Sequence, residues 1–467
     1  KSSLSPQDLC AVVIAAGQGT RMRSDLPKIL HPLGGLPMVG HVLEVCRRLG
    51  VKRTLVVIGH QAERVREALA AYPVEFVLQE DQRGTAHAVL QTEAALQGFV
   101  GDVLVVNGDV PLLSDALVHR LLTTHAESRA LATAVTTKLT NPRGYGRVMR
   151  DARGAFRGIV EEVEATPAQR RVKEINAGIY CFKAPHLFEA LHKVRPSSVK
   201  GEFYLPEVLA ILLKARARIA TVLADDSREV LGINTRGELA DAYGVLRRRV
   251  VDRLMEAGVT CLDPNTTHVS VQATVGRDTT LYPNVQIEGG TRIGEGCTVH
   301  SGSRIRDSQV GNRVTVLDGC VILEAEIADE CILGPYAHLR PGNKLRRKVK
   351  IGNFVELKKS VVGDGSKVPH LTYVGDSTVG ERVNVGAGTI TCNYDGFGKH
   401  QTIIEDDVFI GSNSCLVAPV RIGRGAYVAA GSTITQEVAP DALAFGRAQQ
   451  VNKEGRAALI RASKTKH

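Results

Sequence analysis

Aliphatic residues recur at every sixth position along the second half of the chain. They are Val269, Val275, Leu281, Ile287, Ile293, Val299 and Ile305 in one run, and Ile404, Ile410, Leu416, Ile422, Val428 and Ile434 in another. Neither an α-helix, with a period of 3.6, nor an ordinary strand, with a period of 2, selects every sixth position. The pattern predicts a β-helix of hexapeptide repeats, in which each hexad forms one flat face and its aliphatic residue points into a stacked core.

Glycine directly follows the aliphatic residue at ten positions in this region. They are Gly294, Gly311, Gly334, Gly352, Gly363, Gly375, Gly380, Gly386, Gly411 and Gly423. We expect these glycines to form the corners of the solenoid, because a corner needs backbone angles that glycine adopts without steric cost. An insertion, NYDGFGKHQT, interrupts the beat between Ile390 and Ile404.

The first half of the chain alternates short apolar runs with amphipathic stretches. The runs at 10–16, 54–60, 74–79 and 102–109 predict strands, and the stretches at 41–49, 61–72 and 86–96 predict helices. This alternation is typical of an α/β domain with a doubly wound, mostly parallel sheet. We expect this domain over 6–235, a linker helix over 236–258, the β-helix over 259–440 and a basic tail over 441–467.

Composition narrows the class of protein. A chain of 467 residues with 43% hydrophobic and 23% charged residues is typical of a soluble protein with more than one domain. No apolar run approaches the roughly 20 residues that span a bilayer, and the start of the chain lacks a signal-peptide pattern. Nine cysteines without a CxxC pair argue against a disulfide framework and a zinc site. We therefore expect a reduced, cytoplasmic protein without membrane insertion.

The net charge of +10 gathers at residues 344–350 and 453–466. These clusters are either a solvated surface or a surface that attracts phosphorylated ligands. Only 4% of the residues are aromatic and tryptophan is absent, so the clusters lack the stacking platform of a nucleic-acid-binding surface. Small phosphorylated molecules, rather than nucleic acid, are the expected partners.

The first predicted strand runs into AAGQGTRMRSDLPK, residues 15–28. Gly17 and Gly19 let the backbone approach a phosphate group, which successive N–H groups can cradle. A dinucleotide-binding loop needs a third glycine, but Met22 stands in its place. Arg21 and Lys28 add two positive charges beside the loop, which suits a nucleoside triphosphate and its leaving pyrophosphate.

This string resembles the signature of sugar-nucleotide pyrophosphorylases, and QEDQRGTAHAV, NGDVPLL, GYGR, IVEE, EINAG and GINTR follow in that family's order. The resemblance implies catalytic roles for Arg21 and Lys28, and Mg²⁺ bound by Asp109 and Asn234. A carboxylate at the carboxyl end of a buried strand is also a natural Mg²⁺ ligand. The implied nucleotide- and sugar-binding residues are Ala15, Ala16, Gly17, Gln79, Gly84, Thr85, Asn107, Gly108, Asp109, Gly144, Glu161, Asn176 and Asn234.

The β-helix carries polar strings that a purely structural solenoid does not need: LRPGNK, VELKKS, KVPHLTYVGD and VNVGAGTITCNYDG. They resemble the acetyltransferase half of the bacterial family of bifunctional N-acetylglucosamine-1-phosphate uridyltransferases and glucosamine-1-phosphate acetyltransferases, and the resemblance covers nearly the whole chain. It implies a left-handed solenoid that assembles as a homotrimer and shares a groove between subunits. The site residues that it implies are His370 as general base, Arg340, Lys358, Tyr373 and Asn384 for the sugar phosphate, and Ala387, Asn393, Tyr394, Ser412, Ala430 and Arg447 for acetyl-CoA, with Asn393 also holding the sugar.

The implied function is the synthesis of UDP-N-acetylglucosamine, a precursor of peptidoglycan and lipopolysaccharide. Acetyl-CoA acetylates glucosamine 1-phosphate, and UTP then converts the product in a Mg²⁺-dependent uridylyl transfer that releases pyrophosphate. The alternative is a pyrophosphorylase of one activity whose β-helix is structural or regulatory, against which the HLTY and CNYDG strings argue. A zinc enzyme of the carbonic anhydrase kind needs three convergent histidines, and His300, His338 and His370 lack ligand spacing.

Three positions depart from the family pattern. Ala177 replaces a common threonine and removes a hydroxyl near the expected sugar site, and Asn107 stands where tyrosine is also seen. Pro369 precedes His370, where a smaller residue is usual. None of the three removes a motif residue.

Overall fold

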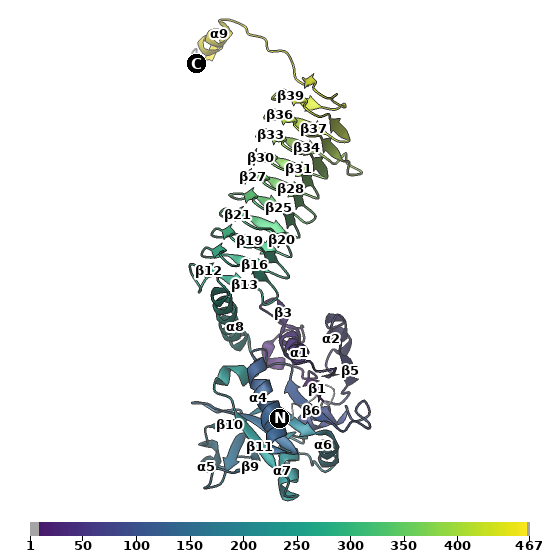
Figure 1. Cartoon of the computed structure of the whole chain (residues 1–467), viewed down its shortest axis with the longest axis vertical. Helices are drawn as coiled ribbons and strands as arrows, with labels where there is room; N and C mark the ends of the chain where they lie inside the picture. The colour runs from purple at the N-terminus through teal and green to yellow at the C-terminus, as the bar shows by residue number, and fades with distance from the viewer. Residues whose placement is uncertain (1–8, 465–467) are drawn as a thin grey trace. The chain divides into compact units, whose positions relative to one another are not determined.

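The computed structural model describes residues 9–464, and the chain divides into two compact units whose border lies between Leu246 and Arg247. Helix α8 (Arg236–Glu256) carries the chain from the first unit into the second. Figure 1 labels the elements of both units. The domain borders that we expect at residues 235, 258 and 440 remain predictions.

The first unit is built on a sheet that has nine strands within residues 9–464. Seven of them lie side by side in the order β11 (Ile219–Leu223), β7 (Ala132–Lys138), β10 (Glu174–Lys183), β6 (Asp102–Asn107), β1 (Leu9–Ile14), β4 (Arg53–Ile58) and β5 (Glu75–Leu78). Only β10 runs against its neighbours β6 and β7, and β8 (Arg147–Arg150) pairs with both β10 and β9 (Phe156–Val160). The prediction of a mostly parallel sheet is confirmed.

Helices cover both faces of this sheet. One apolar cluster joins the sheet to α1 (Met38–Arg48), α2 (Ala62–Ala68) and α4 (Asp115–Ser128), and another joins it to α3 (Thr85–Leu90), α6 (Ala184–Leu191) and α7 (Pro206–Lys214). Alternate residues of β1 and β6 enter the two clusters, as the two-residue period of a strand requires. The shorter elements are η2 (Thr20–Met22), η3 (Lys28–Leu30), β2 (Pro32–Leu33), β3 (Leu36–Pro37), α5 (Pro167–Arg170) and η4 (Ser227–Val230).

Two predicted helices are shorter than we expected, and one of them is α2, which spans Ala62–Ala68 where we predicted a helix over 61–72. We predicted a helix over 86–96, but α3 ends at Leu90 and the chain continues as successive turns. The hydroxyl of Thr92 donates to the carbonyl of Val89 at 2.7 Å, a local bond of the kind that competes with the helical pattern.

The second unit is a solenoid whose strands form three parallel sheets, with 11, 10 and 9 strands in the part of the chain that the structure describes. Its first strand is β12 (Thr260–Cys261) and its last is β41 (Leu443–Ala444). Each strand pairs with the strand one coil later, as β27 (Lys350–Asn353) does with β30 (Lys367–His370). Figure 1 shows these coils stacked one on another. The predicted β-helix is confirmed.

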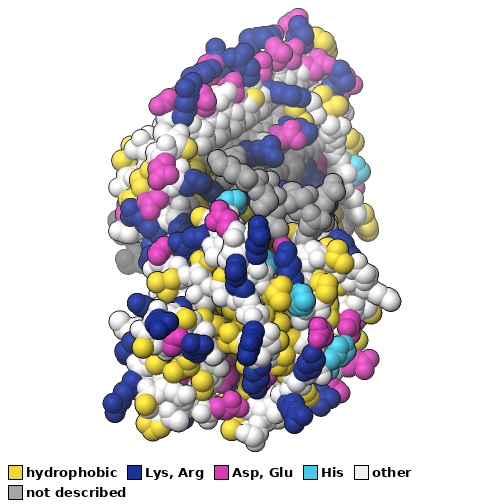
Figure 2. Space-filling model, turned by 60° about the horizontal axis from the view of Figure 1, so that its bottom comes forward, with side chains coloured by type: hydrophobic (Ala, Val, Ile, Leu, Met, Phe, Trp, Pro, Cys, Tyr) yellow, Lys and Arg dark blue, Asp and Glu magenta, His cyan; other side chains and the backbone are white. Residues whose placement is uncertain are grey.

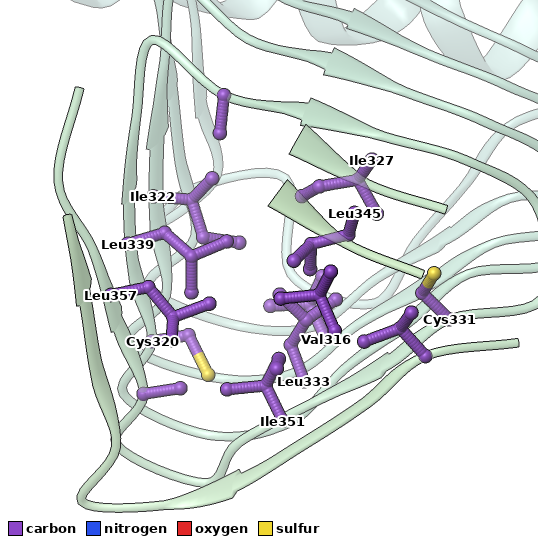
Figure 3. Packing of buried hydrophobic residues seen from close by; sticks show 14 of the residues in the cluster. Val316, Cys320, Ile322, Ile327, Cys331, Leu333, Leu339, Leu345, Ile351 and Leu357 are labelled. Carbon is purple, nitrogen blue, oxygen red and sulfur yellow. The ribbon is translucent and has the colours of Figure 1, made fainter. Parts of the chain in front are cut away.

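The core of the solenoid follows the six-residue beat. Every aliphatic residue of the two runs is buried. Figure 3 shows Ile322, Ile327 and Leu333 pointing toward one another from three different sheets. One coil carries a polar residue at the beat position, because Thr391, six residues after Val385 and paired with Leu416, is buried, whereas its neighbour Ile390 is 37% exposed. This coil lies in VNVGAGTITCNYDG, one of the four polar strings of the solenoid.

The expectation that the glycines after the beat adopt corner angles is wrong for nine of the ten. Only Gly334 among them has a left-handed φ, of 95°. The others are needed for space, because a Cβ on Gly363 would lie 2.4 Å from the carbonyl group of Gly380 on the next coil. The left-handed corner lies two residues later, at Gly365 (φ 68°) after Gly363 and at Arg382 (φ 53°) after Gly380. Close approach of successive coils therefore selects glycine at these positions.

Lys344, Arg347 and Lys348, three of the five basic residues at 344–350, pair with carboxylates of an earlier coil. Lys344 Nζ lies 2.9 Å from Glu326 Oε1, and Arg347 Nη2 lies 3.0 Å from Glu330 Oε1. Figure 2 shows Lys and Arg side chains interspersed with Asp and Glu on the face that it draws. These pairs favour the interpretation of this cluster as a solvated surface.

Three further features concern the cysteines, the basic tail and the length of the helices. All nine cysteines are free thiols. The basic tail contains α9 (Arg456–Lys464), which has no buried residue. Within residues 9–464, no helix is both long and apolar enough to cross a membrane.

Candidate active sites

The loop after β1 holds two glycines with different roles. Ala15 and Ala16 are buried, whereas a Cβ added to Gly17 would meet nothing within 4 Å, so space is open above the loop. Gly19 has a left-handed φ of 62°, and a Cβ there would lie 2.4 Å from the Cβ of Lys28. Gly19 therefore lets η3 bring Lys28 against the loop.

Lys28 bonds to both predicted metal ligands, and Arg21 bonds to one of them, Asn234. Lys28 Nζ donates to Asp109 Oδ2 at 2.5 Å and to Asn234 Oδ1 at 3.0 Å, and Arg21 Nη2 donates to the same Asn234 oxygen at 2.9 Å. Asn234 Nδ2 donates to the carbonyl of Gly232, which turns Oδ1 toward the cations. The Gly108 N–H donates to the carbonyl of Ile14 at 2.9 Å and so fixes the turn that presents Asp109.

This cluster suits a divalent cation. Asp109 Oδ2 and Asn234 Oδ1 converge on one position, which the ammonium group of Lys28 holds. Both atoms are hard oxygen donors of the kind that Mg²⁺ prefers.

A pocket of ≈ 280 Å³ adjoins the cluster. It is lined by Leu112, Tyr145, Arg228, Leu231, Gly232, Ile233, Glu238, Asp241, Ala242 and Val245. Gly232, which lines the pocket, packs against Asp109, because a Cβ on Gly232 would lie 3.2 Å from Asp109 Oδ1.

The predicted base-reading residues form one network beside α3. Gln79 is buried, and its Nε2 donates to the Gly84 carbonyl at 3.2 Å. A Cβ on Gly84 would lie 2.6 Å from the carbonyl oxygen of Phe203, so only glycine fits there. The hydroxyl of Thr85 accepts the N–H of Leu205 at 3.0 Å. The structure thus brings Gln79, Gly84 and Thr85 together.

The predicted sugar-binding residues lie where β8, β9 and β10 meet. Burial raises the pKa of Glu161, and the nearby Glu164 adds to the shift. Asn176 lies at a bulge of β10, where its Nδ2 donates to the Tyr180 hydroxyl at 2.7 Å and its Oδ1 accepts the N–H of Gly178 at 3.2 Å. These contacts fix the rotamer of Asn176.

Other predicted residues surround this junction. Gly144 has a left-handed φ of 88°, and its N–H donates to Glu162 Oε2 at 3.2 Å. A Cβ on Gly178 would lie 2.7 Å from Asn107 Nδ2, so Asn107 packs against the bulge. The side chain of Ala177 is buried in an apolar cluster, so a hydroxyl there would face the core rather than the predicted sugar site.

His370 lies exposed at the end of β30, and its Nδ1 is 2.6 Å from Asn353 Oδ1 on the preceding coil. An amide oxygen only accepts hydrogen bonds, so Nδ1 carries the proton and Nε2 is left as an acceptor. The two coils pack tightly here, because a Cβ on Gly352 would meet the carbonyl oxygen of Pro369. This arrangement is the one that a general base requires.

A second polar cluster lies on the next face, on β28 (Glu356–Lys358) and β31 (Tyr373–Gly375). Lys358 Nζ donates to Asp376 Oδ2 at 3.1 Å, and Asn393 Nδ2 donates to the same oxygen at 2.5 Å and to the Tyr373 hydroxyl at 3.3 Å. A Cβ on Gly375 would lie 2.4 Å from that hydroxyl, so this glycine allows Tyr373 to close over it. Arg340, at the same edge, pairs with Glu356 at 3.0 Å.

Sequence reasoning missed two members of this cluster. Burial opposes ionisation of Asp376, but hydrogen bonds from Lys358 and Asn393 outweigh it and lower its pKa. Lys399, in the insertion, faces Lys358, which lowers the pKa of Lys399. The insertion that interrupts the six-residue beat could have pointed to Lys399, because an insertion in a regular solenoid suggests a functional role for its residues. Tyr394, in the same insertion, is 60% exposed.

Four of the six predicted acetyl-CoA residues form a ladder at one corner, whereas Asn393 bonds to Asp376 and Tyr373 and Tyr394 lies in the insertion. The Ala387 carbonyl accepts the N–H of Asn413 at 2.8 Å, and the Ser412 carbonyl accepts the N–H of Gly431 at 2.8 Å. Arg447 Nη1 donates to the carbonyl of Ala430 at 2.9 Å. The structure therefore places Ala387, Ser412, Ala430 and Arg447 on successive coils.

One predicted residue stands apart from the sugar-phosphate cluster. Asn384 lies on β33 (Asn384–Val385), next to β30 and β36 (Phe409–Ile410). Tyr373 lies on β31, which belongs to a different sheet together with β34 (Ile390–Cys392). One solenoid does not bring Asn384 beside Tyr373.

Among residues 9–464, one group of at least three side chains could together ligate a metal: Asp102, His125 and Cys181. It is buried at the start of β6, whereas Asp109 follows the other end of that strand. Lys183 Nζ lies 2.6 Å from Asp102 Oδ1 and compensates the charge of that carboxylate. The group contains none of His300, His338 and His370, which lends no support to a zinc site of three histidines.

Known families match both units of the chain. Residues 11–175 match the MobA-like NTP transferase domain. Residues 272–307 match the bacterial transferase hexapeptide (six repeats), and residues 401–436 match the hexapeptide repeat of succinyl-transferase. Each half of the predicted fold therefore has an independent match.

Relatives match along almost the full chain, and several are named bifunctional protein GlmU. The protein from Heliobacterium modesticaldum is 49% identical over 444 residues, which are 95% of this chain and 96% of the relative. The protein from Listeria monocytogenes is 48% identical over 454 residues, 97% and 99% of the two chains. The protein from Geobacter metallireducens is 47% identical over 466 residues, 96% and 98%. The chain belongs to the family of bifunctional GlmU proteins.

Proposed function

We propose that this chain catalyses two consecutive reactions that yield UDP-N-acetylglucosamine. The second unit transfers the acetyl group of acetyl-CoA to the amine of glucosamine 1-phosphate. The first unit transfers a uridylyl group from UTP to the resulting N-acetylglucosamine 1-phosphate and releases pyrophosphate. The observation that carries the proposal is that each unit holds its own lysine–carboxylate cluster, Lys28 with Asp109 and Lys358 with Asp376.

Uridylyl transfer needs positioning and charge neutralisation rather than a protein nucleophile. A phosphate oxygen of the sugar 1-phosphate attacks the α-phosphorus of UTP, and the bond to the β-phosphate breaks. Lys28 and Arg21 stand beside the open space above Gly17, where they can neutralise the charge that develops on the pyrophosphate. Mg²⁺, held by Asp109 and Asn234, would supply further neutralisation of the phosphate oxygens.

Recognition of the two substrates falls to opposite sides of this cluster. We assign the base of UTP to Gln79, Gly84 and Thr85, whose hydrogen bonds are described above. We assign the sugar to Asn176 and Glu161, at the junction of β8, β9 and β10. The bulge of β10 supports this assignment, because bulges re-aim side chains beside active sites.

Acetyl transfer needs a base, because an amine must lose a proton to attack a thioester carbonyl. His370 Nε2 accepts this proton, while the bond between Nδ1 and Asn353 keeps the ring oriented. The new C–N bond forms as the C–S bond breaks, and the thiolate of coenzyme A leaves. Lys358 and Arg340 supply positive charge for the sugar phosphate, Arg340 through its planar fork.

We further propose that the protein acts as a homotrimer in the cytosol. Asn384 and Tyr373 lie on different faces of one solenoid, so both can contact one sugar only if a neighbouring copy contributes one of them. Nine free thiols suit a reducing compartment.

The alternative is an enzyme with one activity and a structural solenoid. A structural solenoid has no need for the hydrogen-bonded set of Lys358, Asp376, Asn393 and Tyr373. The test is to give the purified full chain glucosamine 1-phosphate and acetyl-CoA, and separately N-acetylglucosamine 1-phosphate and UTP. Release of free thiol in the first assay and of pyrophosphate in the second is expected. Pyrophosphate release without thiol release would establish the alternative.

A further inference from the structure

Arg147, on β8, is one of the largest fully buried side chains of the molecule, with an exposure of 2%. Its guanidinium Nη2 lies 2.7 Å from Glu162 Oε2, and its Nη1 donates to the carbonyl of Tyr145. Only the Arg147 side of this pair is buried, because the Glu162 side chain is 27% exposed. Such a pair is weak evidence for a role in stability, because desolvation of the Arg147 charge offsets much of its attraction to Glu162. The pair therefore calls for an explanation other than stability.

The contacts of this pair converge on the glycine loop, residues 144–146. Glu162 Oε2, which pairs with Arg147, also accepts the N–H of Gly144 at 3.2 Å. Arg147 binds the carbonyl of Tyr145, in the middle of the loop. The loop is thus bonded at two successive residues to one ion pair.

This loop needs such support because of its composition and its neighbours. Gly144 has a left-handed φ of 88°, and glycine loses more conformational freedom on ordering than any other residue. A Cβ on Gly146 would lie 3.0 Å from Glu161 Oε1 and 2.9 Å from Ile159. The carbonyl of Gly146 accepts the N–H of Asn176 at 2.9 Å. A displacement of the loop would therefore move the surroundings of both Glu161 and Asn176.

We propose that Arg147 and Glu162 are positioning residues, which hold the loop of residues 144–146 against Glu161 and Asn176 and so set the affinity for the sugar ring of the sugar 1-phosphate. The inference rests on the proposed function, because it takes the sugar to bind at this junction. Neither residue touches the reacting phosphorus, so the pair affects sugar binding rather than the chemical step.

The chain offers a matched control on the same strand. Arg150 Nη2 lies 2.6 Å from Glu174 Oε1, and the Glu174 side chain is 12% exposed, but neither residue contacts the glycine loop through a hydrogen bond that the structure shows. Glu174→Gln removes one charge of a comparable pair without disturbing the loop. Glu162→Gln keeps an oxygen that can accept the N–H of Gly144 but removes the charge that orients Arg147.

The experiment measures uridylyl transfer by the full chain while N-acetylglucosamine 1-phosphate is varied at saturating UTP. Glu162→Gln should raise KM for the sugar phosphate about tenfold, with kcat within about twofold and KM for UTP unchanged. Arg147→Lys should give a smaller rise, because one ammonium group cannot make both contacts of the guanidinium. Glu174→Gln should leave KM for the sugar phosphate at the wild-type value.

Calorimetric binding of N-acetylglucosamine 1-phosphate to the same proteins separates this inference from the proposed function. Weaker binding by Glu162→Gln than by the wild type and Glu174→Gln supports the inference. Equal binding by all three proteins overturns it, and so does a fall in kcat without a rise in KM. A wild-type chain that binds the sugar phosphate but releases no pyrophosphate would instead overturn the proposed function.

Discussion

The role of the glycines in the solenoid can be tested with two alanine variants that differ in position by two residues. Gly363→Ala places a Cβ 2.4 Å from the carbonyl carbon and oxygen of Gly380, where ordinary contacts begin near 3.4 Å. Gly365→Ala places a Cβ in open space but at a left-handed φ of 68°. Close packing and backbone angle are thus separated within one corner.

The structure gives the size of each effect. In Gly363→Ala the two coils must separate by about 1 Å, which overpacks the corner and strains two bonds between coils, from the Gly363 N–H to the Val379 carbonyl and from the Arg382 N–H to the Asp364 carbonyl. We expect a loss of about 2–4 kcal/mol. In Gly365→Ala the cost is that of one left-handed residue, about 1 kcal/mol.

The measurement is hydrogen–deuterium exchange over residues 355–390 in both full-chain variants at one protein concentration, together with the denaturation midpoint of acetyl transfer. Gly363→Ala should raise exchange strongly and lower the midpoint, and Gly365→Ala should stay close to the wild type. An equal or larger effect of Gly365→Ala would refute the argument, and backbone angle would then explain the glycines.

Three further outcomes are expected. Asn353→Ala should lower acetyl transfer about tenfold, because His370 loses the bond that fixes its ring, with uridylyl transfer as the unaffected control; an unchanged rate would remove Asn353 from the account. Burial opposes ionisation of Asp102, but bonds from His125 and Lys183 lower its pKa, so its contribution to stability is present above about pH 4 and is lost as the pH falls below that value. Urea midpoints between pH 6 and pH 3 should therefore fall less in Asp102→Asn than in the wild type, and parallel curves would contradict this. Light scattering should give three times the 50.2 kDa of one chain, whereas an acetyl-transferring monomer would exclude a shared site.

Much of the fold was predictable because it follows from periodicity. Every sixth residue is aliphatic because its side chain is buried in the core of the solenoid, as Ile305 and Ile410 are. Thr391, a polar residue at a beat position, also points inward, and it lies where the polar side chains around Lys358 and Asn393 crowd the outside of the coil. Periodicity identifies which residues are buried, but it does not reveal why glycine follows them. That reason lies in the distance between coils.

The candidate sites were predictable where a motif is continuous along the chain, as in the loop from Ala15 to Lys28. Sequence reasoning placed Lys28 beside a phosphate, but it did not show that Lys28 bonds to both Asp109 and Asn234. Asp376 and Lys399 were missed because their partners come from other coils. Such contacts depend on which residues of neighbouring coils lie side by side, and a short sequence motif does not contain that information.

The central claim is that two independent sites on one chain perform two consecutive reactions. The most direct test gives glucosamine 1-phosphate, acetyl-CoA and UTP to three full-length proteins, the wild type, Asp109→Ala and His370→Ala, and follows both sugar products by mass spectrometry. Asp109→Ala should accumulate N-acetylglucosamine 1-phosphate. His370→Ala should acetylate about 10²–10⁴-fold more slowly, yet it should convert added N-acetylglucosamine 1-phosphate to UDP-N-acetylglucosamine at the wild-type rate. Loss of both reactions in either variant, or full acetyl transfer in His370→Ala, would contradict the account.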